Sequence, residues 1–313
     1  MSASIGRYAF ALAPLVAAAL WGGMYVVSKW GFELIPPVTL GFLRVAVGGG
    51  ALWLVVAGRG GSTPSRDEWP AFVALGGWVT LTVATQFVGT ELTNASQGSL
   101  LTVLTPVFTV LLGAAVLGER VTAAKAGGMT VAGAGTAVVI AGQYDLASMA
   151  AGNAAGVALL LVGSGAWAGY TVWGLPAVRR HGALRAATYS SLASVPMLGA
   201  LAAVELWYLG LSPAEVPLTA ESVAAVLYLG LASTAAAWYL WYKGLEFVPA
   251  GTVAVFFFAQ PAVGAALGAA LLGEALGPGY LIGGALMTAG IWAVSRERAA
   301  STDGDEAHDA AAE

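Results

Sequence analysis

The chain has 313 residues, of which 58% are hydrophobic and only 10% are charged, and its mean hydropathy is +0.78. These values exclude a soluble globular domain as the main part of the chain. The formal net charge of −4 comes from five acidic residues after Ala300, and the body is close to neutral, which does not favour nucleic acid as a partner. Because cysteine is absent, the chain has no disulfide, no thiolate metal site and no cysteine nucleophile.

Apolar runs long enough to cross a bilayer follow one another along the whole chain. A helix needs roughly 20 apolar residues to span a membrane. The expected spans are 10–31, 37–57, 69–89, 96–117, 122–141, 153–174, 186–208, 218–242, 250–272 and 277–295. These runs are continuously apolar, whereas the strands of a membrane barrel would alternate over about ten residues. The sequence therefore predicts an all-α integral membrane protein with ten transmembrane helices, followed by a disordered acidic tail at 299–313.

An internal duplication organises these spans. The segment 89–119 recurs 155 residues later as 244–274, with about eleven of 31 positions identical in an ungapped comparison. Pro106 matches Pro261, and both prolines lie within apolar runs that would otherwise be continuous helices. Matching interruptions in two repeated apolar helices indicate the binding site of a secondary transporter.

The distribution of basic residues predicts how the two copies are oriented. Every basic loop would lie on the same side of the membrane if both termini are cytoplasmic. The basic residues concerned are Arg7, Arg59, Arg66, Arg120, Lys125, Arg179, Arg180, Arg185, Lys243, Arg296 and Arg298. Since each copy contains five helices, the second copy must enter from the opposite face, and the two repeats are predicted to be inverted.

Several short motifs resemble a known family. They are Trp21-Gly22-Gly23 with Lys29, Pro37 followed by Phe42-Leu43-Arg44, and Pro106 followed by Leu117-Gly118-Glu119-Arg120, with Pro261 and Leu272-Gly273-Glu274 in the second half. Together they resemble the EamA family of the drug/metabolite transporter superfamily. The resemblance implies two five-helix repeats, at 10–141 and 153–295, that move small metabolites and often export amino acids or toxic compounds. The second half departs from the pattern because it has no counterpart to Arg44 and no arginine after Glu274.

The two prolines predict where a substrate would bind. Each lies about ten residues into its span, close to the bilayer midplane, and frees the carbonyl four residues earlier, at Thr102 and Phe257. Thr102, Thr105 and Gln260 supply polar atoms at the same depth, and Phe257 an apolar surface. We expect a central cavity here; the alternative is a kink that only shapes helix packing.

Arg44 is the costliest residue in the chain to insert into a membrane. It lies about seven residues into its helix, and an arginine near the helix centre costs on the order of 2.5–3.5 kcal/mol on insertion scales. Such residues usually face a cavity or a partner. Arg44 and Lys29 are therefore candidate contacts for an anionic substrate, and Gln86 and Asn94 are further cavity candidates. The alternative for Arg44 is a structural bond to helix-end carbonyls, Glu33 or Glu91.

Other conspicuous residues are expected to be structural. Glu91 and Glu246 occupy equivalent positions before matching helices, and Glu119 and Glu274 are expected to cap the helix that follows each of them, since an acid is stabilising at a helix N-terminus. Trp241 and Tyr242, near a helix end, are expected in the aromatic belt at the membrane surface.

The sequence thus predicts a multi-pass transporter in the cytoplasmic membrane, without cofactor or metal, that moves a small molecule by alternating access, with export the expected direction. The alternative is a membrane protein with a structural or receptor-like role. An intramembrane enzyme is disfavoured because the chain's two histidines, His181 and His308, lie in a loop and in the tail, where neither can activate a nucleophile within the membrane. Substrate, energy coupling and a homodimer are left open.

Overall fold

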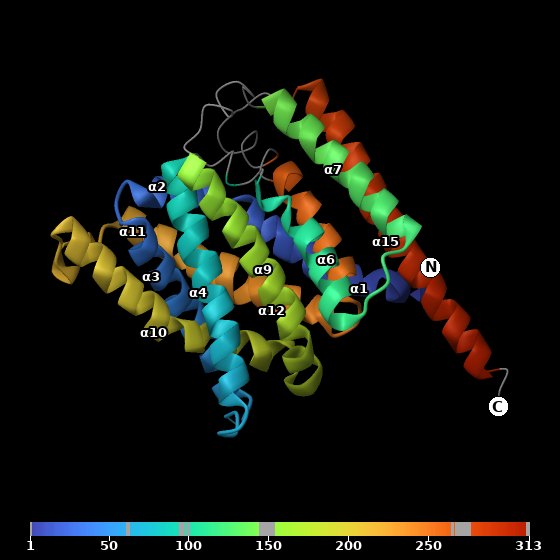
Figure 1. Ribbon diagram of the computed structural model, residues 1–313, viewed down its shortest axis with the longest axis horizontal. Helices are drawn as coiled ribbons and strands as arrows, with labels where there is room; N and C mark the ends of the chain where they lie inside the picture. The colour runs from blue at the N-terminus through green and yellow to red at the C-terminus, as the bar shows by residue number, and fades with distance from the viewer. Residues whose placement is uncertain are drawn as a thin grey trace.

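The structure is a computed structural model that describes residues 2–60, 63–93, 98, 101–143, 154–263, 266 and 277–310. These residues form helices joined by short turns, and no strand occurs among them (Figure 1). In the first half the helices are α1 (Ser2–Gly22), α2 (Met24–Phe32), α3 (Pro37–Gly58), α4 (Trp69–Leu92), α6 (Thr105–Leu117) and α7 (Ala123–Gln143). In the second half they are α9 (Ala154–His181), α10 (Ala183–Leu209), α11 (Ala220–Leu227), η2 (Tyr228–Ala236), α12 (Ala237–Leu245), α13 (Ala250–Ala254), η3 (Val255–Phe258) and α15 (Pro278–Ala310).

Helix is the expected state for such apolar segments, because a backbone in lipid must satisfy its hydrogen bonds within the segment. Six helical stretches in the described part are long and apolar enough to cross a membrane, and Thr105–Leu117 and Ala250–Val263 are shorter apolar helices. The six are Ala11–Phe32, Pro37–Gly58, Trp69–Leu92, Ala154–His181, Ala183–Leu209 and Ala220–Leu245. The prediction of an all-helical, multi-pass membrane protein is confirmed. Through the tail that the sequence predicts to be disordered, the backbone of α15 continues as a helix to Ala310.

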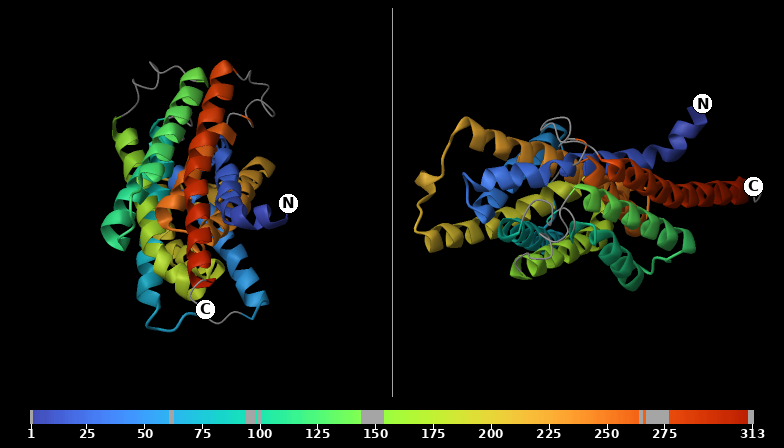
Figure 2. Two further views of the ribbon diagram at one scale, coloured as in Figure 1. Left: turned by 90° about the vertical axis from the view of Figure 1, so that its right-hand side faces the viewer. Right: turned by 90° about the horizontal axis from the view of Figure 1, so that it is seen from above.

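The helices form a bundle with one pair set at its edge. Within the bundle, α4 packs along α9 and α3 along α10. Helices α7 and α15 run side by side as a separate pair, which all views agree on (Figures 1 and 2). Glycines bring these two backbones into contact: a Cβ on Gly135 would lie 2.5 Å from the carbonyl oxygen of Gly283, and a Cβ on Gly290 would lie 2.4 Å from that of Gly128.

Three helical segments depart from α-helical geometry. The chain forms a turn at 103–104, and α6 then starts with Pro106 in its first turn, where proline is tolerated. In the second half, η3 is a 3₁₀ segment just before Pro261, and η2 is a nine-residue π-helix. Such irregular turns within helices often mark hinges or functional sites. The first two contribute Thr105 and Phe257 to the lining of a central cavity, and η2 bonds to Arg44, which also lines it.

The expectation that Trp241 and Tyr242 form part of the membrane-surface belt is wrong. Both are fully buried, where they pack with Trp21, Tyr170 and Phe257. The sequence gives no sign of this, because a helix end can lie at the membrane surface or inside a bundle.

The aromatic residues that do fit a surface belt are Trp207 and Tyr208. They lie at the end of α10 with 80% and 82% of their surface exposed.

Candidate functional site

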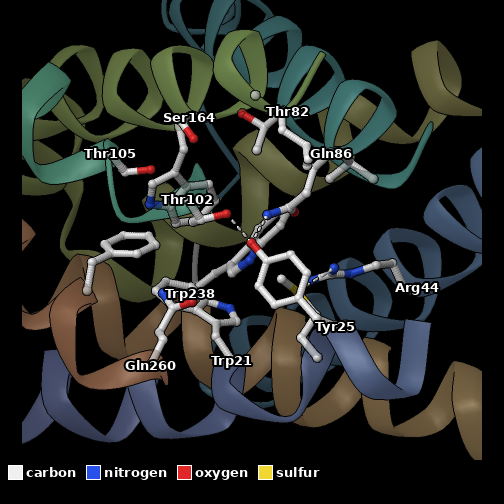
Figure 3. A pocket seen from close by; sticks show the side chains of 16 residues that line it. Trp21, Tyr25, Arg44, Thr82, Gln86, Thr102, Thr105, Ser164, Trp238 and Gln260 are labelled. Atoms are coloured by element: carbon white, nitrogen blue, oxygen red, sulfur yellow. Dashed lines mark hydrogen bonds between the residues drawn. The ribbon is translucent and has the colours of Figure 1, made fainter. Parts of the chain in front are cut away.

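A cavity lies at the centre of the bundle, where helices of both halves meet. Figure 3 shows the sixteen residues that line it, which come from α1, α2, α3, α4, the turn before α6 and its start, α9, α12, η3 and the residues just before Pro261. They are Trp21, Met24, Tyr25, Arg44, Thr82, Val83, Gln86, Thr102, Thr105, Leu160, Gly163, Ser164, Trp167, Trp238, Phe257 and Gln260. The free volume is about 30 Å³, enough for one or two water molecules but not for a metabolite.

Arg44 is the one charged residue among the described residues that line the cavity. Its side chain is 1% exposed. Its Nε donates to Thr234 Oγ1 at 2.8 Å, Nη1 lies 3.0 Å from Met24 Sδ, and Nη2 donates to the Ser233 carbonyl at 3.1 Å. The guanidinium carbon also lies 5.3 Å from the Phe87 ring centroid, within cation–π range. Every one of these partners is neutral, and Arg44 makes no ion pair with any described carboxylate.

The π-helix η2 presents the groups that hold this guanidinium. Thr234 Oγ1 donates to the carbonyl of Leu229, five residues earlier, at 2.7 Å while it accepts from Arg44. The carbonyl of Ser233 accepts from Arg44 and from Trp21 Nε1, the latter at 2.8 Å. The π-helix thus directs a carbonyl and a hydroxyl toward Arg44. The sequence prediction missed Ser233 and Thr234, although two hydroxyl residues within an apolar run were a signal.

A hydrogen-bonded chain of neutral groups crosses the cavity beside Arg44. Tyr25 bonds through its hydroxyl to Thr102 Oγ1 and accepts from Gln86 Nε2 at 2.8 Å (Figure 3). Thr102 in turn is within 2.7 Å of the carbonyl of Gly98 in the preceding turn. This chain joins α2 and α4 to the interrupted helix before α6.

The other end of the cavity holds polar groups without partners. Thr105 Oγ1, Trp167 Nε1 and Gln260 Nε2 are buried, and none of them has a hydrogen-bond partner among the described residues. Thr105 and Gln260 lie opposite Arg44 across the cavity (Figure 3). Buried polar groups in native proteins are nearly always satisfied, so an unsatisfied set in a cavity indicates that water or a ligand binds there.

The structure brings most of the sequence-predicted binding residues together. Six of them line the cavity, namely Arg44, Gln86, Thr102, Thr105, Phe257 and Gln260. Lys29 does not line it: its Nζ pairs with Glu91 Oε2 at 2.8 Å at the half-exposed end of α2. Asn94 lies outside the described residues. Pro106 and Pro261 lie at the helix interruptions described above, and their role in gating stays a prediction.

The flanking glutamates have structural partners, but not all the expected ones. Glu119 does not cap the helix that follows it. Instead its carboxylate accepts from the backbone N–H groups of Ala250 and Gly251, at 2.8 and 3.1 Å, and so caps α13 in the other half. Glu274 lies outside the described residues.

Glu246 and Glu91 bind different partners. Glu246 accepts from the N–H of Ala183 at the start of α10 at 2.6 Å and also pairs with Lys243. The residue matching Ala183 at the start of α3 is Pro37, which has no N–H to donate. Glu91 pairs with Lys29 instead.

Matched positions in the two halves make matched contacts around the cavity. Trp21 and Trp167, which are 146 residues apart and each open a Trp-x-Gly motif, meet edge to face at 5.2 Å. Tyr25 and its equivalent Thr171 accept hydrogen bonds from Gln86 and from its equivalent Trp241, at 2.8 and 3.1 Å respectively. The sequence prediction missed Trp167; comparing the Trp-x-Gly motifs would have found it.

Comparison with known proteins identifies the family. The EamA-like transporter family model matches the chain twice, over residues 8–141 and 154–296. The chain belongs to the EamA-like transporter family. The duplication read from the sequence is therefore a family repeat, and the multi-pass membrane character agrees with it.

Relatives of this EamA-like chain are named as transporters. An uncharacterized transporter of Archaeoglobus fulgidus is 27% identical over 288 residues, which cover 90% of this chain and 97% of the relative. A probable terminal-alkyne amino-acid exporter of Streptantibioticus cattleyicolor is 27% identical over 93% of this chain and 96% of its own. A probable amino-acid metabolite efflux pump of Salmonella typhimurium is 26% identical over 89% and 92%.

One solved crystal structure shares the fold. It superposes with a TM-score of 0.75 over 94% of this chain and 98% of its own, at 23% identity. At that identity the likeness shows the fold alone.

Proposed function

We propose that the protein is a secondary transporter that exports a small metabolite across the cytoplasmic membrane by alternating access. The observation that carries the proposal is the central cavity, where a buried guanidinium with no acidic partner among the described residues faces three polar groups that likewise have no described partner. A purely structural core would have paired or excluded these groups, because buried charges are costly unless they are compensated. The names of the two exporters among the relatives support the direction.

The proposed architecture is ten transmembrane helices in two inverted five-helix repeats, with both termini in the cytoplasm. The distribution of basic residues supports this orientation. Alternating access would open the cavity to one side at a time, with the interrupted helices at Pro106 and Pro261 as the parts that move. Glu119 caps α13 and so links the two halves. Such motion would either break this contact or move both partners together.

The rival function is a structural or receptor-like membrane protein. An enzyme has little support, because no described residue lining the cavity is a histidine, and His181 lies at the end of α9 against Glu68 at 3.4 Å. If the protein were structural or receptor-like, the metabolites that cells release should not depend on Arg44.

The experiment compares the metabolites released by cells that express the wild-type protein, the Arg44→Leu variant or the Gln260→Ala variant, by untargeted mass spectrometry. We expect at least one metabolite to accumulate outside wild-type cells and to return to background with Arg44→Leu at equal membrane abundance. Identical extracellular profiles for all strains would refute the proposal.

A further inference from the structure

Arg44 is the one charged residue among the described residues that line the cavity, and its positive charge determines which cargoes can bind. Building on the proposed function, we propose that the cargo is a monocarboxylate with an apolar, ring-sized body and no amino group, exported as an anion by the membrane potential. This class excludes amino acids, the cargo named for two of the relatives, because the described lining has no carboxylate to pair with their ammonium group.

The first argument is the missing counter-charge of Arg44. Its partners among the described residues are a hydroxyl, a carbonyl, a thioether and aromatic rings, all of them neutral. Two acids at the ends of neighbouring helices are engaged elsewhere: Glu91 binds Lys29, and Glu205 accepts from the N–H groups of Val38 and Thr39 at the start of α3. A guanidinium has five N–H donors in a planar fork that matches a carboxylate. A carboxylate on the cargo would supply the negative charge that no described residue places beside Arg44.

The second argument is that the described lining of the cavity offers no carboxylate to an ammonium group. None of its described lining residues is an aspartate or a glutamate. An α-ammonium would lie within a few ångströms of the carboxylate bound to Arg44, so it would also be repelled by the guanidinium. The carboxylate of a zwitterion would therefore pair with Arg44, but its ammonium group would have no oppositely charged partner. An organic cation would bring only a positive charge, which has no such partner.

The third argument concerns the body of the cargo. Trp21, Trp167 and Phe257 form a continuous aromatic wall, with Trp21 stacked on Phe257 at 5.3 Å and Trp167 edge to face with Phe257 at 6.4 Å. Such a wall suits a flat apolar group. The unpartnered groups of Thr105, Trp167 and Gln260 at the far end could bind a neutral polar substituent.

The driving force follows from the same charge. With no carboxylate among the described lining residues, the cavity has no acid to carry a proton in exchange for the cargo. A monoanion needs none, because the inside-negative potential expels it. One elementary charge across 100 mV is equivalent to about 2.3 kcal/mol, which supports a concentration gradient on the order of 50-fold.

The test uses three compounds that share a phenyl ring and differ in charge: 3-phenylpropanoate is an anion, phenylalanine a zwitterion and phenethylammonium a cation. Purified protein in proteoliposomes would be assayed for uptake of each, with potassium and valinomycin setting the potential and protein-free liposomes correcting for leakage of the neutral acid. We expect uptake of 3-phenylpropanoate at least tenfold faster than of the other two. Uptake of 3-phenylpropanoate should be faster when the inside of the proteoliposomes is positive. A current measurement should show that this uptake carries negative charge inward.

Variants separate the charge from the fold. Arg44→Met should reduce anion uptake at least tenfold, and Arg44→Lys should retain part of it. The matched control is Lys243→Met, which removes a cation paired with Glu246 at the end of α12 and should leave uptake within twofold. The sign of the wild-type current tests the proposal even if an Arg44 variant fails to fold.

Two outcomes overturn this inference while the proposed function stands. One is uptake of phenylalanine as fast as that of 3-phenylpropanoate. The other is absence of 3-phenylpropanoate uptake by a protein whose expression still changes the extracellular metabolites. Uptake that a pH gradient drives and the potential does not would refute the driving force. Failure of the proposed function itself would appear as unchanged extracellular metabolites in every strain.

Discussion

Glu119 offers a sharp test of how the two halves are joined. Its carboxylate accepts two backbone hydrogen bonds at the start of α13 and lies 3.7 Å from Lys125 Nζ, and all these groups are largely buried. Glu119→Gln keeps one acceptor oxygen, so it removes one charge-assisted bond, which is worth about 1.5–3 kcal/mol. It also leaves Lys125 without its carboxylate. We expect the free energy of unfolding to fall by about 2–3 kcal/mol.

The matched control lies at the other end of the same repeated segment. Glu91 pairs with Lys29 at a half-exposed position, and such pairs contribute about 0–1 kcal/mol. Glu91→Gln should therefore cost at most about 1 kcal/mol. Reversible unfolding in mixed micelles, followed by tryptophan fluorescence as sodium dodecyl sulfate is increased, measures both variants. Equal losses for the two variants would contradict the role of Glu119 as a cap that joins the halves.

Three further results are expected. Gly135→Ala should destabilise the protein by about 1–3 kcal/mol in the same assay, since its Cβ would lie 2.5 Å from a backbone oxygen of α15, whereas Gly127→Ala, which meets nothing within 4 Å, should be neutral or slightly stabilising. Trp21→Phe loses its bond to Ser233 and should cost about 1 kcal/mol more than Trp167→Phe, whose indole N–H has no described partner; a reversed order would contradict the assignment. A reporter fused to the C-terminus should be reached only from the cytoplasm, and labelling from outside intact cells would refute the proposed topology.

The sequence predicts the class of protein and six of the sixteen residues that line the cavity, because these depend on strong local signals. Helices follow from long apolar runs, and polar residues beside Pro106 and Pro261 mark the depth at which helices are interrupted. Arg44 stands out for the same reason: a cation within an apolar helix has few acceptable surroundings.

What the sequence could not predict depends on packing between distant helices. The cap by Glu119 joins positions about 130 residues apart, and an acid after a helix gives no sign of which N-terminus it meets. The burial of Trp241 depends on α12 lying inside the bundle. Likewise, the Ser233 carbonyl of η2 accepts hydrogen bonds from Arg44 and Trp21, which lie in helices far away in the sequence.

The duplication explains the scaffold, and a departure from it explains the chemistry. Met24 and Tyr170 occupy matching positions, as do Arg44 and Ser190, and the contacts match too: Arg44 Nη1 lies 3.0 Å from Met24 Sδ, and the hydroxyls of Ser190 and Tyr170 lie 2.9 Å apart. Ser190 also bonds to the carbonyl of Ala186, whereas Arg44 has no counter-charge among the described residues. In the proposed mechanism, two equivalent halves would exchange conformations around one centre, and a centre with a cation on one side only would bind its cargo in one orientation. Symmetry would then account for how the cavity opens to either face, and the single cation for which end of the cargo is held.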